Sequence, residues 1–354
     1  MVDWFPIIDG TNRGFGADLI RFALRTLTPF YASGVAVRNW LYDRNWLGRT
    51  RLSVPVVSVG NVTTGGSGKT PFVVWLARTF QVAGWSPGLL SRGYLSLDSH
   101  GNDEGRLLSR LCPGVPHVQQ RDRVAGGQRA ISELGCDVLV VDDGFQHRRL
   151  ARDLDIVLLD AVVPWGYGAL LPRGLMRESA SSLRRADLVV LTRVNQVSEA
   201  DVERLRKTLA GLTSAPVAGV SFEPTSLRDG VGGILPLERL QGCRVGAFCG
   251  IGNPTGFRLS MNDLCDASRG WVFRAFPDHH HYRVEDLAEL AAWGTAEGVD
   301  LFLTTGKDMV KLPEGGIGGV PLLSVEIETR FAFGEDVVRE RIDRLRTMRV
   351  IGSR

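Results

Sequence analysis

The sequence has few of the features that mark secreted proteins, zinc ribbons and nucleic-acid-binding proteins. It has only five cysteines among 354 residues, and no two of them form a Cys-x-x-Cys pair. This argues against a disulfide framework or a zinc ribbon, and it predicts a reduced, cytosolic compartment. The net charge is only +3, and no stripe of clustered basic and aromatic residues accompanies it. Nucleic acid is therefore not an expected partner.

Long apolar runs and a secretory leader are also lacking. The first twelve residues do not combine a basic region with an apolar core, so we expect no signal peptide. Between residues 13 and 51, the longest uncharged run covers only residues 26–37 and contains Pro29 and Gly34. A bilayer span takes about 20 apolar residues, so no transmembrane helix is expected.

The N-terminal segment nevertheless has an unusual pattern. Residues 13–51 contain seven arginines and two aspartates, interleaved with leucine, phenylalanine, tryptophan and tyrosine. Such an amphipathic segment suits the surface of an anionic membrane. A helix packed on a sheet, with its arginines in solvent, fits the pattern equally well. Both interpretations stay open on the pattern alone.

A glycine-rich segment is the most informative feature of the sequence. Residues 54–59 read as a buried strand, a turn ending in Gly68-Lys69-Thr70 follows, and residues 71–82 are typical of a helix. This order forms a phosphate-binding P-loop, because the N–H groups of the turn and the positive helix end face the same anion. The residues expected to bind nucleotide are Thr63, Thr64, Gly65, Gly66, Ser67, Gly68, Lys69 and Thr70.

Two side chains of this segment have distinct expected roles. Lys69 reaches the β- and γ-phosphates and so takes part in catalysis, while the Thr70 hydroxyl ligates Mg²⁺. Thr63 stands where the strict pattern has glycine, six residues before Lys69. Gly65 and Gly66 still let the backbone approach a phosphate. The alternative is a glycine-rich turn that holds no ligand.

Asp142 and Asp143 are the expected second half of this site. They end the apolar run that starts at residue 138, as in a buried parallel strand that delivers carboxylates to the edge of a sheet. In P-loop enzymes an acid so placed holds Mg²⁺, directly or through water. We expect Asp142 to be the better metal ligand and Asp143 the second candidate, or a loop cap.

The nucleotide is expected to be ATP. Guanine-specific P-loop proteins carry an Asn/Thr-Lys-x-Asp loop after a late strand, and the nearest candidate here, Thr192-Arg-Val-Asn195, lacks that aspartate. ATPases with the deviant P-loop of the partition class need lysine at the position of Thr64, so that class is disfavoured.

Several further motifs, in order along the chain, resemble one family. The sequence closely resembles tetraacyldisaccharide 4′-kinase, the lipid A 4′-kinase, over roughly residues 15–345. The motifs are Gly60-Asn-Val-Thr-Thr-Gly-Gly-Ser-Gly-Lys-Thr70, Ser91-Arg-Gly-Tyr94, Asp142-Asp-Gly-Phe-Gln-His-Arg-Arg-Leu-Ala-Arg-Asp153, Leu171-Pro-Arg-Gly-Leu-Met-Arg-Glu178, Gly250-Ile-Gly-Asn-Pro254, Phe276-Pro-Asp-His279 and Thr304-Thr-Gly-Lys-Asp308.

The resemblance implies an activity and a place in the cell. It implies transfer of the ATP γ-phosphate to the 4′-hydroxyl of an acylated glucosamine disaccharide 1-phosphate, a lipid A precursor. A lipid acceptor also favours the membrane interpretation of the N-terminal segment, as peripheral attachment to the cytoplasmic face of the inner membrane. Two rivals remain: a P-loop kinase for another acceptor, and a non-catalytic ATP-binding module at the membrane.

The resemblance also implies a base for the reaction. Asp103, in Gly101-Asn-Asp-Glu-Gly105, matches the family's base, and His279 matches its histidine partner. A carboxylate near a sugar hydroxyl can accept its proton as phosphate transfers, and the imidazole can orient that carboxylate. Asn102 and Gly105 replace the usual residues around Asp103. Arg173 and Arg177, in the matching stretch, are candidates to contact the γ-phosphate or the acceptor.

The run His279-His-His281 also permits a zinc interpretation. Adjacent histidines point in different directions on a regular backbone, so at most two could share an ion. Cysteine is absent nearby at zinc spacing, and only Asp278 could contribute a further ligand. The orienting role of His279 is preferred.

The chain length predicts two domains. We expect an α/β fold: a P-loop NTPase-like, mostly parallel sheet with a second, smaller α/β domain and a two-stranded connector. The expected ranges are 1–52 for the amphipathic segment, 53–222 for the P-loop kinase domain, 223–330 for the second domain, and 331–354 for a C-terminal helix and tail. Residues 217–222 and 322–327 would form the connector, with the active site in the cleft below and His279 reaching Asp103 on closure.

Overall fold

A computed structural model describes residues 5–93, 103–265 and 268–352 of the chain. The chain forms two compact units, each assembled from separate stretches. The first unit comprises Met1–Arg92, Gly114–Ser221 and Arg330–Arg354, and the second comprises Gly93–Pro113 and Phe222–Thr329. Each unit is described by itself.

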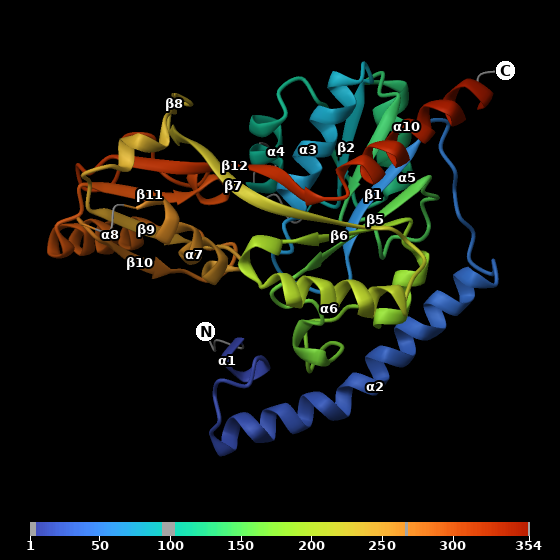
Figure 1. Ribbon diagram of the computed structural model, residues 1–354, viewed down its shortest axis with the longest axis horizontal. Coiled ribbons are helices and arrows are strands. Elements are labelled where there is room, and N and C mark those ends of the chain that lie inside the picture. The colour runs from blue at the N-terminus through green and yellow to red at the C-terminus, as the bar shows by residue number, and fades with distance from the viewer. Residues whose placement is uncertain (1–4, 94–102, 266–267, 353–354) are drawn as a thin grey trace. The chain divides into compact units, whose positions relative to one another are not determined.

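The first unit is built on a parallel sheet (Figure 1). The pairs β1–β4, β1–β5, β2–β3, β2–β4, β5–β6 and β6–β7 are all parallel. The strands follow the order β7 (Val217–Asp229), β6 (Leu188–Thr192), β5 (Leu154–Asp160), β1 (Val56–Asn61), β4 (Val138–Asp142), β2 (Pro87–Ser91) and β3 (His117–Gln119). The order reverses around β1, and ligands bind at such switch points, beyond the carboxyl ends of the strands.

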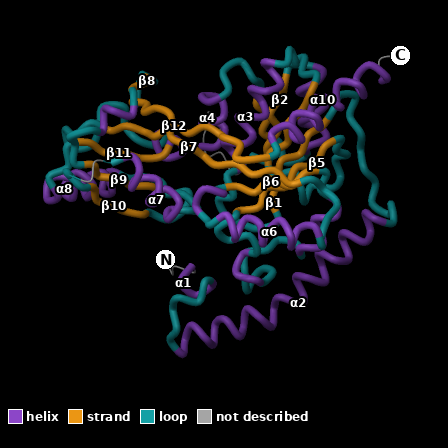
Figure 2. The backbone as a smooth tube through the Cα atoms, in the orientation of Figure 1, coloured by secondary structure: helices purple, strands orange, loops and turns teal. Residues whose placement is uncertain are grey.

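Helices cover both faces of this sheet, and β1 is buried along its whole length. Leu205 and Leu209 of α6 (Glu199–Ala210) pack in one cluster with Val157 and Val189 of the sheet. Helix α5 (Arg123–Ser132) packs on the same face, and α3 (Lys69–Val82) buries its apolar side chains on the other (Figure 2). Short 3₁₀ turns η1 (Gly166–Gly168), η2 (Ala180–Arg185) and η3 (Val194–Gln196) lie in the connections.

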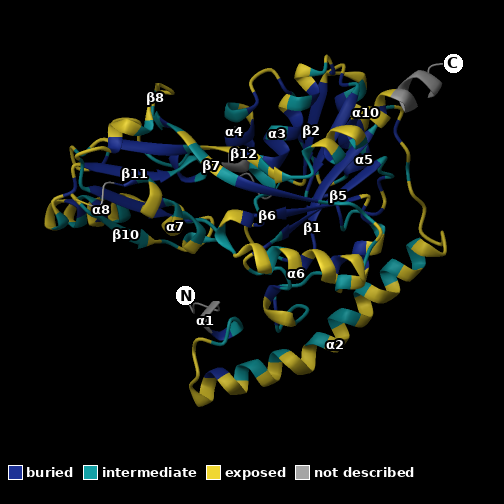
Figure 3. Ribbon diagram, in the orientation of Figure 1, coloured by how far each residue is buried: buried dark blue, intermediate teal, exposed yellow. Residues whose placement is uncertain are grey.

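Both ends of the chain contribute helices to the first unit. After the short α1 (Phe5–Ile8), α2 (Phe15–Asp43) runs for 29 residues through Pro29. Most of α2 is exposed or half-buried, in contrast to the strands (Figure 3). Among the described residues, no helix combines the length and the apolarity needed to cross a membrane. Helix α10 (Glu335–Gly352) packs Val338, Ile342 and Leu345 into the core.

The second unit is a smaller α/β sheet. Its strand order is β10 (Trp271–Ala275), β9 (Val245–Cys249), β11 (Leu301–Thr305), β12 (Leu322–Phe333) and β7, with the short β8 (Ile234–Leu235) antiparallel to β7. Helices α7 (Pro254–Leu264) and α8 (Val284–Glu297) pack on clusters formed by alternate residues of β9 and β11, and so cover opposite faces. The 3₁₀ turn η4 (Leu237–Leu240), α9 (Gly306–Met309) and α4 (Asp103–Leu111) complete the unit.

The predicted fold class is confirmed, and the strands fall within a few residues of the expected positions. The division along the chain differs in one respect from the expected continuous ranges. Helix α4, with Asp103 at its start, belongs to the second unit because it packs on α9. Asp103 and His279 therefore lie in the same unit, rather than in two different domains as expected. The expected connector strands β7 and β12 are neighbours in the sheet, and each contributes residues to both units.

Candidate active site

The P-loop connects the central strand of the first unit to a helix. Strand β1 ends at Asn61 and α3 begins at Lys69, two residues earlier than expected. Gly65 and Gly68 have φ values of 101° and 79°, which favour glycine because a side chain would be strained there. Inside the loop, Asn61 Nδ2 donates to Ser67 Oγ at 3.0 Å, and both side chains are buried. The turn is thus held from within, with Lys69 and Thr70 in the first turn of α3.

The acidic pair lies beside this loop. Strands β1 and β4 are in register with Val59 opposite Asp142, so Asp142 lies next to the start of the loop. Asp142 is buried, and its carbonyl accepts from Arg123 Nη2 at 3.3 Å. Asp143 follows in the left-handed region, with φ of 53°, and its side chain is one-third exposed. The Lys69 Nζ atom lies 3.6 Å from Asp143 Oδ1.

The charge of Asp143 is stabilised by its neighbours. Burial raises the pKa of this carboxyl, but the Lys69 and Arg177 cations act in the opposite direction and outweigh burial, and Arg177 also donates hydrogen bonds to it. The net effect holds the pKa of Asp143 below its usual value. The carboxylate is therefore ionised at neutral pH, as a metal ligand or a partner for cations must be.

The donor set at this edge fits Mg²⁺. Carboxylates and hydroxyls are the hard oxygen ligands that Mg²⁺ prefers, and few protein ligands suffice when phosphates and water supply the rest. Asp142 ends β4 beside the strand that leads into the loop, and Thr70 is the second residue of α3. These two residues, with Asp143, carry oxygen atoms that could hold a metal.

The segment after β5 folds onto the P-loop. The Thr64 N–H donates to the Leu175 carbonyl at 2.7 Å, and the Arg177 N–H donates to the Val62 carbonyl at 2.7 Å. Thr63 and Met176 form an isolated β-bridge at the same place. These backbone hydrogen bonds join two segments of the chain. Thr63 and Thr64 therefore support a neighbouring strand-like segment as well as the loop.

This segment separates the two arginines that the sequence grouped together. Arg177 Nη1 lies 2.8 Å from both carboxylate oxygens of Asp143 and 3.4 Å from Gln146 Oε1. Arg173 instead donates from Nη1 to the Ile8 carbonyl at 3.0 Å and borders a pocket beside α2. Arg177 is the arginine at the acidic pair, while Arg173 contacts Ile8 instead.

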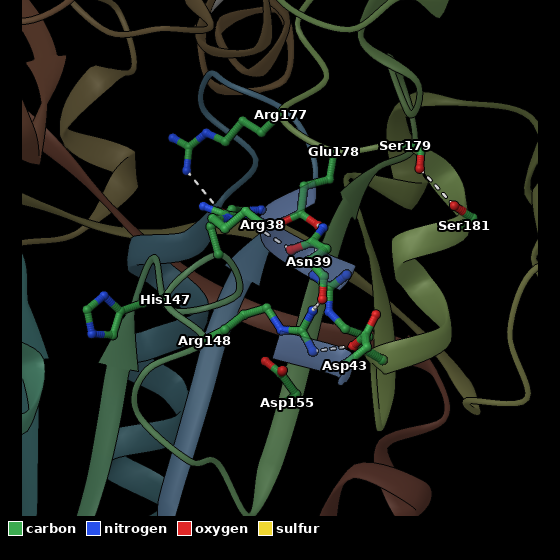
Figure 4. A network of polar contacts seen from close by, with 12 residues as sticks. Arg38, Asn39, Asp43, His147, Arg148, Asp155, Arg177, Glu178, Ser179 and Ser181 are labelled. Carbon is green, nitrogen blue, oxygen red and sulfur yellow. Dashed lines mark hydrogen bonds and ion pairs between the residues drawn. The ribbon is translucent and has the colours of Figure 1, made fainter. Parts of the chain in front are cut away.

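Glu178 connects the same segment to α2 (Figure 4). Its side chain is only 1% exposed. Its oxygens accept from Arg38 Nη2 at 3.3 Å, Asn39 Nδ2 at 2.7 Å and Arg185 Nη2 at 2.9 Å. Tyr31 of α2 also donates to the Arg177 carbonyl at 3.0 Å. The position of Arg177 is therefore fixed from both sides by α2 and by the P-loop.

His147 lies on the loop that follows the acidic pair (Figure 4). Burial lowers the pKa of this imidazole, and the nearby Arg123 and Arg152 cations lower it further, to about 4. His147 is consequently neutral at physiological pH. It adds no positive charge beside Asp143.

The proposed base and its partner are in the second unit. Asp103 is the first residue of α4 rather than a loop residue, and its side chain lies outside the described structure. One helical turn later, Leu107 and Arg110 pack against Gly306, where an added β-carbon would lie 3.4 Å and 2.8 Å from them. The next residue, Lys307, lies 3.2 Å from His279 Nε2 and 3.3 Å from Asp278 Oδ1. The exposed His279 thus contacts Lys307 of α9, the helix on which α4 packs.

Comparisons with known proteins identify the family. The model described as tetraacyldisaccharide-1-P 4′-kinase matches residues 20–346. The chain belongs to the tetraacyldisaccharide 4′-kinase family. A relative with that name from Syntrophus aciditrophicus is 39% identical over 332 residues, which cover 87% of this chain and 88% of the relative. Another, from Anaeromyxobacter sp. (strain Fw109-5), is 39% identical over 330 residues, 88% of each chain.

A solved structure supports the same assignment. The chain is similar to LpxK from Aquifex aeolicus, described as in complex with ATP, with a TM-score of 0.73 and 31% sequence identity. The match covers 92% of this chain and 99% of that one. The resemblance inferred from the motifs is confirmed, and so is the P-loop type of fold.

One support of the P-loop in this tetraacyldisaccharide 4′-kinase family member was missed by sequence reasoning. Thr192 Oγ1 donates to the Ser67 carbonyl at 3.1 Å. Arg193, in the left-handed region, contacts both the Gly66 carbonyl and Asp160. Both residues belong to Thr192-Arg-Val-Asn195, which was interpreted in the sequence analysis only as a candidate loop for base specificity. The position after β6, next but one to β1 in the sheet, could have indicated a structural role.

The histidine run does not gather metal ligands in the described part of this chain. His279 contacts Lys307, whereas His280 Nε2 lies 3.1 Å from Asp286 Oδ2, so the two rings have different partners. Within residues 5–93, 103–265 and 268–352, no group of three or more His, Cys, Asp or Glu residues could hold a metal ion by itself. Any metal bound at the P-loop therefore depends on phosphate or water oxygens for part of its coordination.

Proposed function

We propose that this chain transfers the γ-phosphate of ATP to the 4′-hydroxyl of tetraacyldisaccharide 1-phosphate, a step in lipid A biosynthesis. The observation that carries the proposal is Lys69 in the first turn of α3, next to the ionised Asp143, in a chain of the tetraacyldisaccharide 4′-kinase family. The P-loop offers N–H groups and a cation to phosphate, and the acidic pair offers oxygen ligands.

The residues of the site have separate roles in phosphoryl transfer. Residues 63–70 bind the nucleotide phosphates, Lys69 neutralises charge on the β- and γ-phosphates, and Thr70 with Asp142 and Asp143 would hold Mg²⁺. The metal supplies positive charge that helps to bind and orient the phosphates. Arg177, rather than Arg173, contributes a second cation near the transferred group, because it shares Asp143 with Lys69.

Asp103 and His279 are proposed to remove the proton from the acceptor hydroxyl. A carboxylate in the first turn of a helix is stabilised as an anion, so Asp103 is available to accept a proton. Lys307 is placed to hold His279 through its Nε2 atom, which leaves Nδ1 free to donate to a carboxylate. The histidine would thus orient the base, and Lys307 would orient the histidine.

Peripheral attachment to the cytoplasmic face of the inner membrane is proposed for α2. Six exposed apolar side chains recur along it at spacings of three, four, seven or eight residues, which places them on one face. They are Phe15, Leu19, Phe22, Phe30, Val37 and Trp40. Phe22 is 65% exposed and Phe30 is 78% exposed. Arg44 and Arg49, both exposed, add positive charge in the same region, as suits an anionic membrane surface.

The decisive experiment measures transfer of labelled γ-phosphate from ATP to tetraacyldisaccharide 1-phosphate in mixed micelles. Wild-type protein should phosphorylate this acceptor in a Mg²⁺-dependent manner, and Lys69→Ala should not. Free glucosamine and phosphatidylinositol serve as alternative acceptors. Transfer to one of these but not to the disaccharide would replace the proposed acceptor. ATP binding without transfer to any acceptor would favour a non-catalytic module.

A further inference from the structure

A pocket of about 280 Å³ lies beside α2 and is separate from the P-loop. It is lined by Arg25, Thr28 and Pro29 of α2 and by Tyr167, Gly168, Ala169 and Arg173. Three consecutive residues, Gly166, Tyr167 and Gly168, have positive φ values of 50°, 62° and 72°. This left-handed turn forms part of the pocket wall. The volume is near the lower end of ligand pockets, roughly 300 Å³.

The pocket gathers positive charge without a matching anion. Arg173 Nη1 donates to the Ile8 carbonyl, but its buried Nε has no hydrogen-bond partner among the described residues. Arg25 makes no ion pair in the described part of the chain. Burial lowers the pKa of Arg173, and the Arg25 and Arg21 cations lower it further, with no carboxylate acting in the opposite direction. Buried N–H groups are normally hydrogen-bonded, so the unpartnered Nε of the half-buried Arg173, beside the exposed Arg25, fits an external anion.

The acids near the pocket already have partners. Arg21 pairs with Asp18 at 2.5 Å, and Asp160 near Tyr167 pairs with Arg193. Asp9, the other acid near Tyr167, accepts from the Thr11 N–H and hydroxyl, each at 2.8 Å. Burial, together with Asp9 and Asp160, raises the pKa of Tyr167, so its phenol stays protonated and can donate a hydrogen bond.

The pocket is rigidly connected to the P-loop. Ala169 and Arg173 belong to one turn, closed by the hydrogen bonds Gly174 N to Leu170 O at 3.0 Å and Met176 N to Ala169 O at 3.1 Å. Within this turn, the Leu175 carbonyl accepts from the Thr64 N–H of the P-loop at 2.7 Å. On the other wall, Arg25 precedes Tyr31 by six residues, about 9 Å of helix rise, and Tyr31 donates to the Arg177 carbonyl. The pocket and the P-loop are therefore connected through the turn at residues 169–176 and through α2.

We propose that Arg25 and Arg173 bind the glycosyl 1-phosphate of the acceptor while its far sugar presents the 4′-hydroxyl for transfer. This inference rests on the proposed function. The 1-phosphate and the 4′-hydroxyl are at opposite ends of the disaccharide, and the exposed apolar face of α2 borders the pocket for the acyl chains. Guanidinium groups bind phosphate oxygens through directed, charge-assisted hydrogen bonds. The 1-phosphate thus fixes the register of the acceptor.

The test compares two acceptors and two variants. Tetraacyldisaccharide with and without its 1-phosphate is assayed with wild type, Arg25→Gln and the matched control Arg13→Gln. Arg13 is exposed, precedes α2 and lies outside the pocket. Arg13→Gln therefore removes one positive charge near the start of α2 without changing the lining of the pocket. Arg25→Gln should lower kcat/KM for the phosphorylated acceptor about 10- to 100-fold, mainly through KM, and leave the dephosphorylated acceptor unchanged.

The source of the phosphate is distinguished by liposome binding. Wild type and Arg25→Gln should float equally with anionic liposomes. If Arg25→Gln also loses kcat/KM only for the phosphorylated acceptor, the pocket binds the phosphate of the acceptor. An equal loss of activity on both acceptors, or weaker flotation that accounts for the loss, would overturn the assignment in favour of a bilayer phospholipid. Loss in Arg13→Gln of the same size would overturn it as well.

A binding measurement keeps this inference separate from the proposed function. If wild type phosphorylates neither acceptor, the proposed function fails, and phosphorus NMR titration with glucosamine 1-phosphate still tests the pocket. Line broadening with wild type and Arg13→Gln that is lost in Arg25→Gln and reduced in Arg173→Gln supports a phosphate site. Equal broadening in all four proteins overturns it.

Discussion

A single nitrogen of Arg177, Nη1, lies 2.8 Å from both carboxylate oxygens of Asp143. Lys69 approaches the same carboxylate, so Asp143 holds two cations at the place where phosphates are expected to bind. Removing Arg177 should lower phosphoryl transfer because one positive charge near the developing phosphate charge is lost. We expect Arg177→Ala to reduce kcat/KM about 10²-fold and Arg177→Lys to recover part of it. Steady-state kinetics at saturating Mg²⁺ measures this, and wild-type kinetics in Arg177→Ala would exclude the role.

Asp103 and His279 should act as a unit. We expect Asp103→Ala to lower kcat about 10²–10⁴-fold while ATP affinity is largely kept. Residues that work as a unit have non-additive effects, so adding His279→Gln to Asp103→Ala should cost little more. The measurement is a double-mutant cycle on kcat, with His281→Gln as a neighbouring control. If the kcat losses of the two single variants multiply in the double variant, Asp103 and His279 act independently.

Glu178 should matter for stability as well as for activity. Its buried carboxylate pairs with Arg38 and Arg185, and an uncharged amide would leave these arginines without their counter-ion. We expect Glu178→Gln to lower the free energy of unfolding by about 3 kcal/mol. Glu203→Gln is a matched control, because Glu203 is half exposed and its ion pairs with Arg206 and Lys207 lie on the surface of α6. Chemical denaturation should find a change below about 1 kcal/mol for that variant.

His147 should make the protein less stable in mild acid. Its pKa is about 4 in the folded protein, below the ordinary value of 6.5, so the unfolded chain binds a proton between these values and the folded protein does not. The contribution to stability is complete above pH 6.5 and is lost as the pH falls towards 4, by about 2–3 kcal/mol.

Replacing this histidine gives a direct check. His147→Gln should show a smaller difference in unfolding free energy between pH 7.5 and pH 4.5 than wild type, whereas His281→Gln, on the surface, should behave as wild type does. Denaturant titrations at the two pH values measure the difference. Parallel pH profiles for wild type and His147→Gln would contradict the assignment.

Helix α2 should control membrane attachment through its apolar face. Replacing Phe22 and Phe30 together with serine removes two large exposed side chains from that face, and flotation with anionic liposomes should fall. Val82→Ser is the control, because Val82 is 91% exposed at the end of α3. If the double variant floats as wild type does, the α2 face is not the attachment surface.

Much of the fold followed from the sequence because parallel strands read as short apolar runs and the P-loop has a strong local pattern. Strand β3 was missed because it has only three residues, and His117 and Gln119 do not read as an apolar run. Helix α4 was not expected, since Asp103 follows a glycine-rich stretch that resembles a turn. Its packing on α9 depends on residues about 200 positions away, which no local pattern reveals.

The site shows the same limit. Local pattern predicts Lys69 and Thr70 beside the start of a helix and Asp142 at the end of a strand, and the structure has them at these positions. It was not sufficient to separate Arg173 from Arg177, four positions apart in one stretch, because the direction of each side chain is set by the turn at residues 169–176. The role of Arg193 likewise depends on how β6 is placed in the sheet, which is a tertiary property.

The discontinuous make-up of the two units has a consequence for synthesis on the ribosome. The segment Gly93–Pro113 emerges more than 100 residues before the rest of the second unit, and α10, which fills the core of the first unit, emerges last. The second unit cannot complete its packing before residues 222–329 are available, and the first unit also needs α10. Folding of this protein is therefore expected to be largely post-translational, and nascent chains that stall before residue 335 should expose apolar core surface that chaperones recognise.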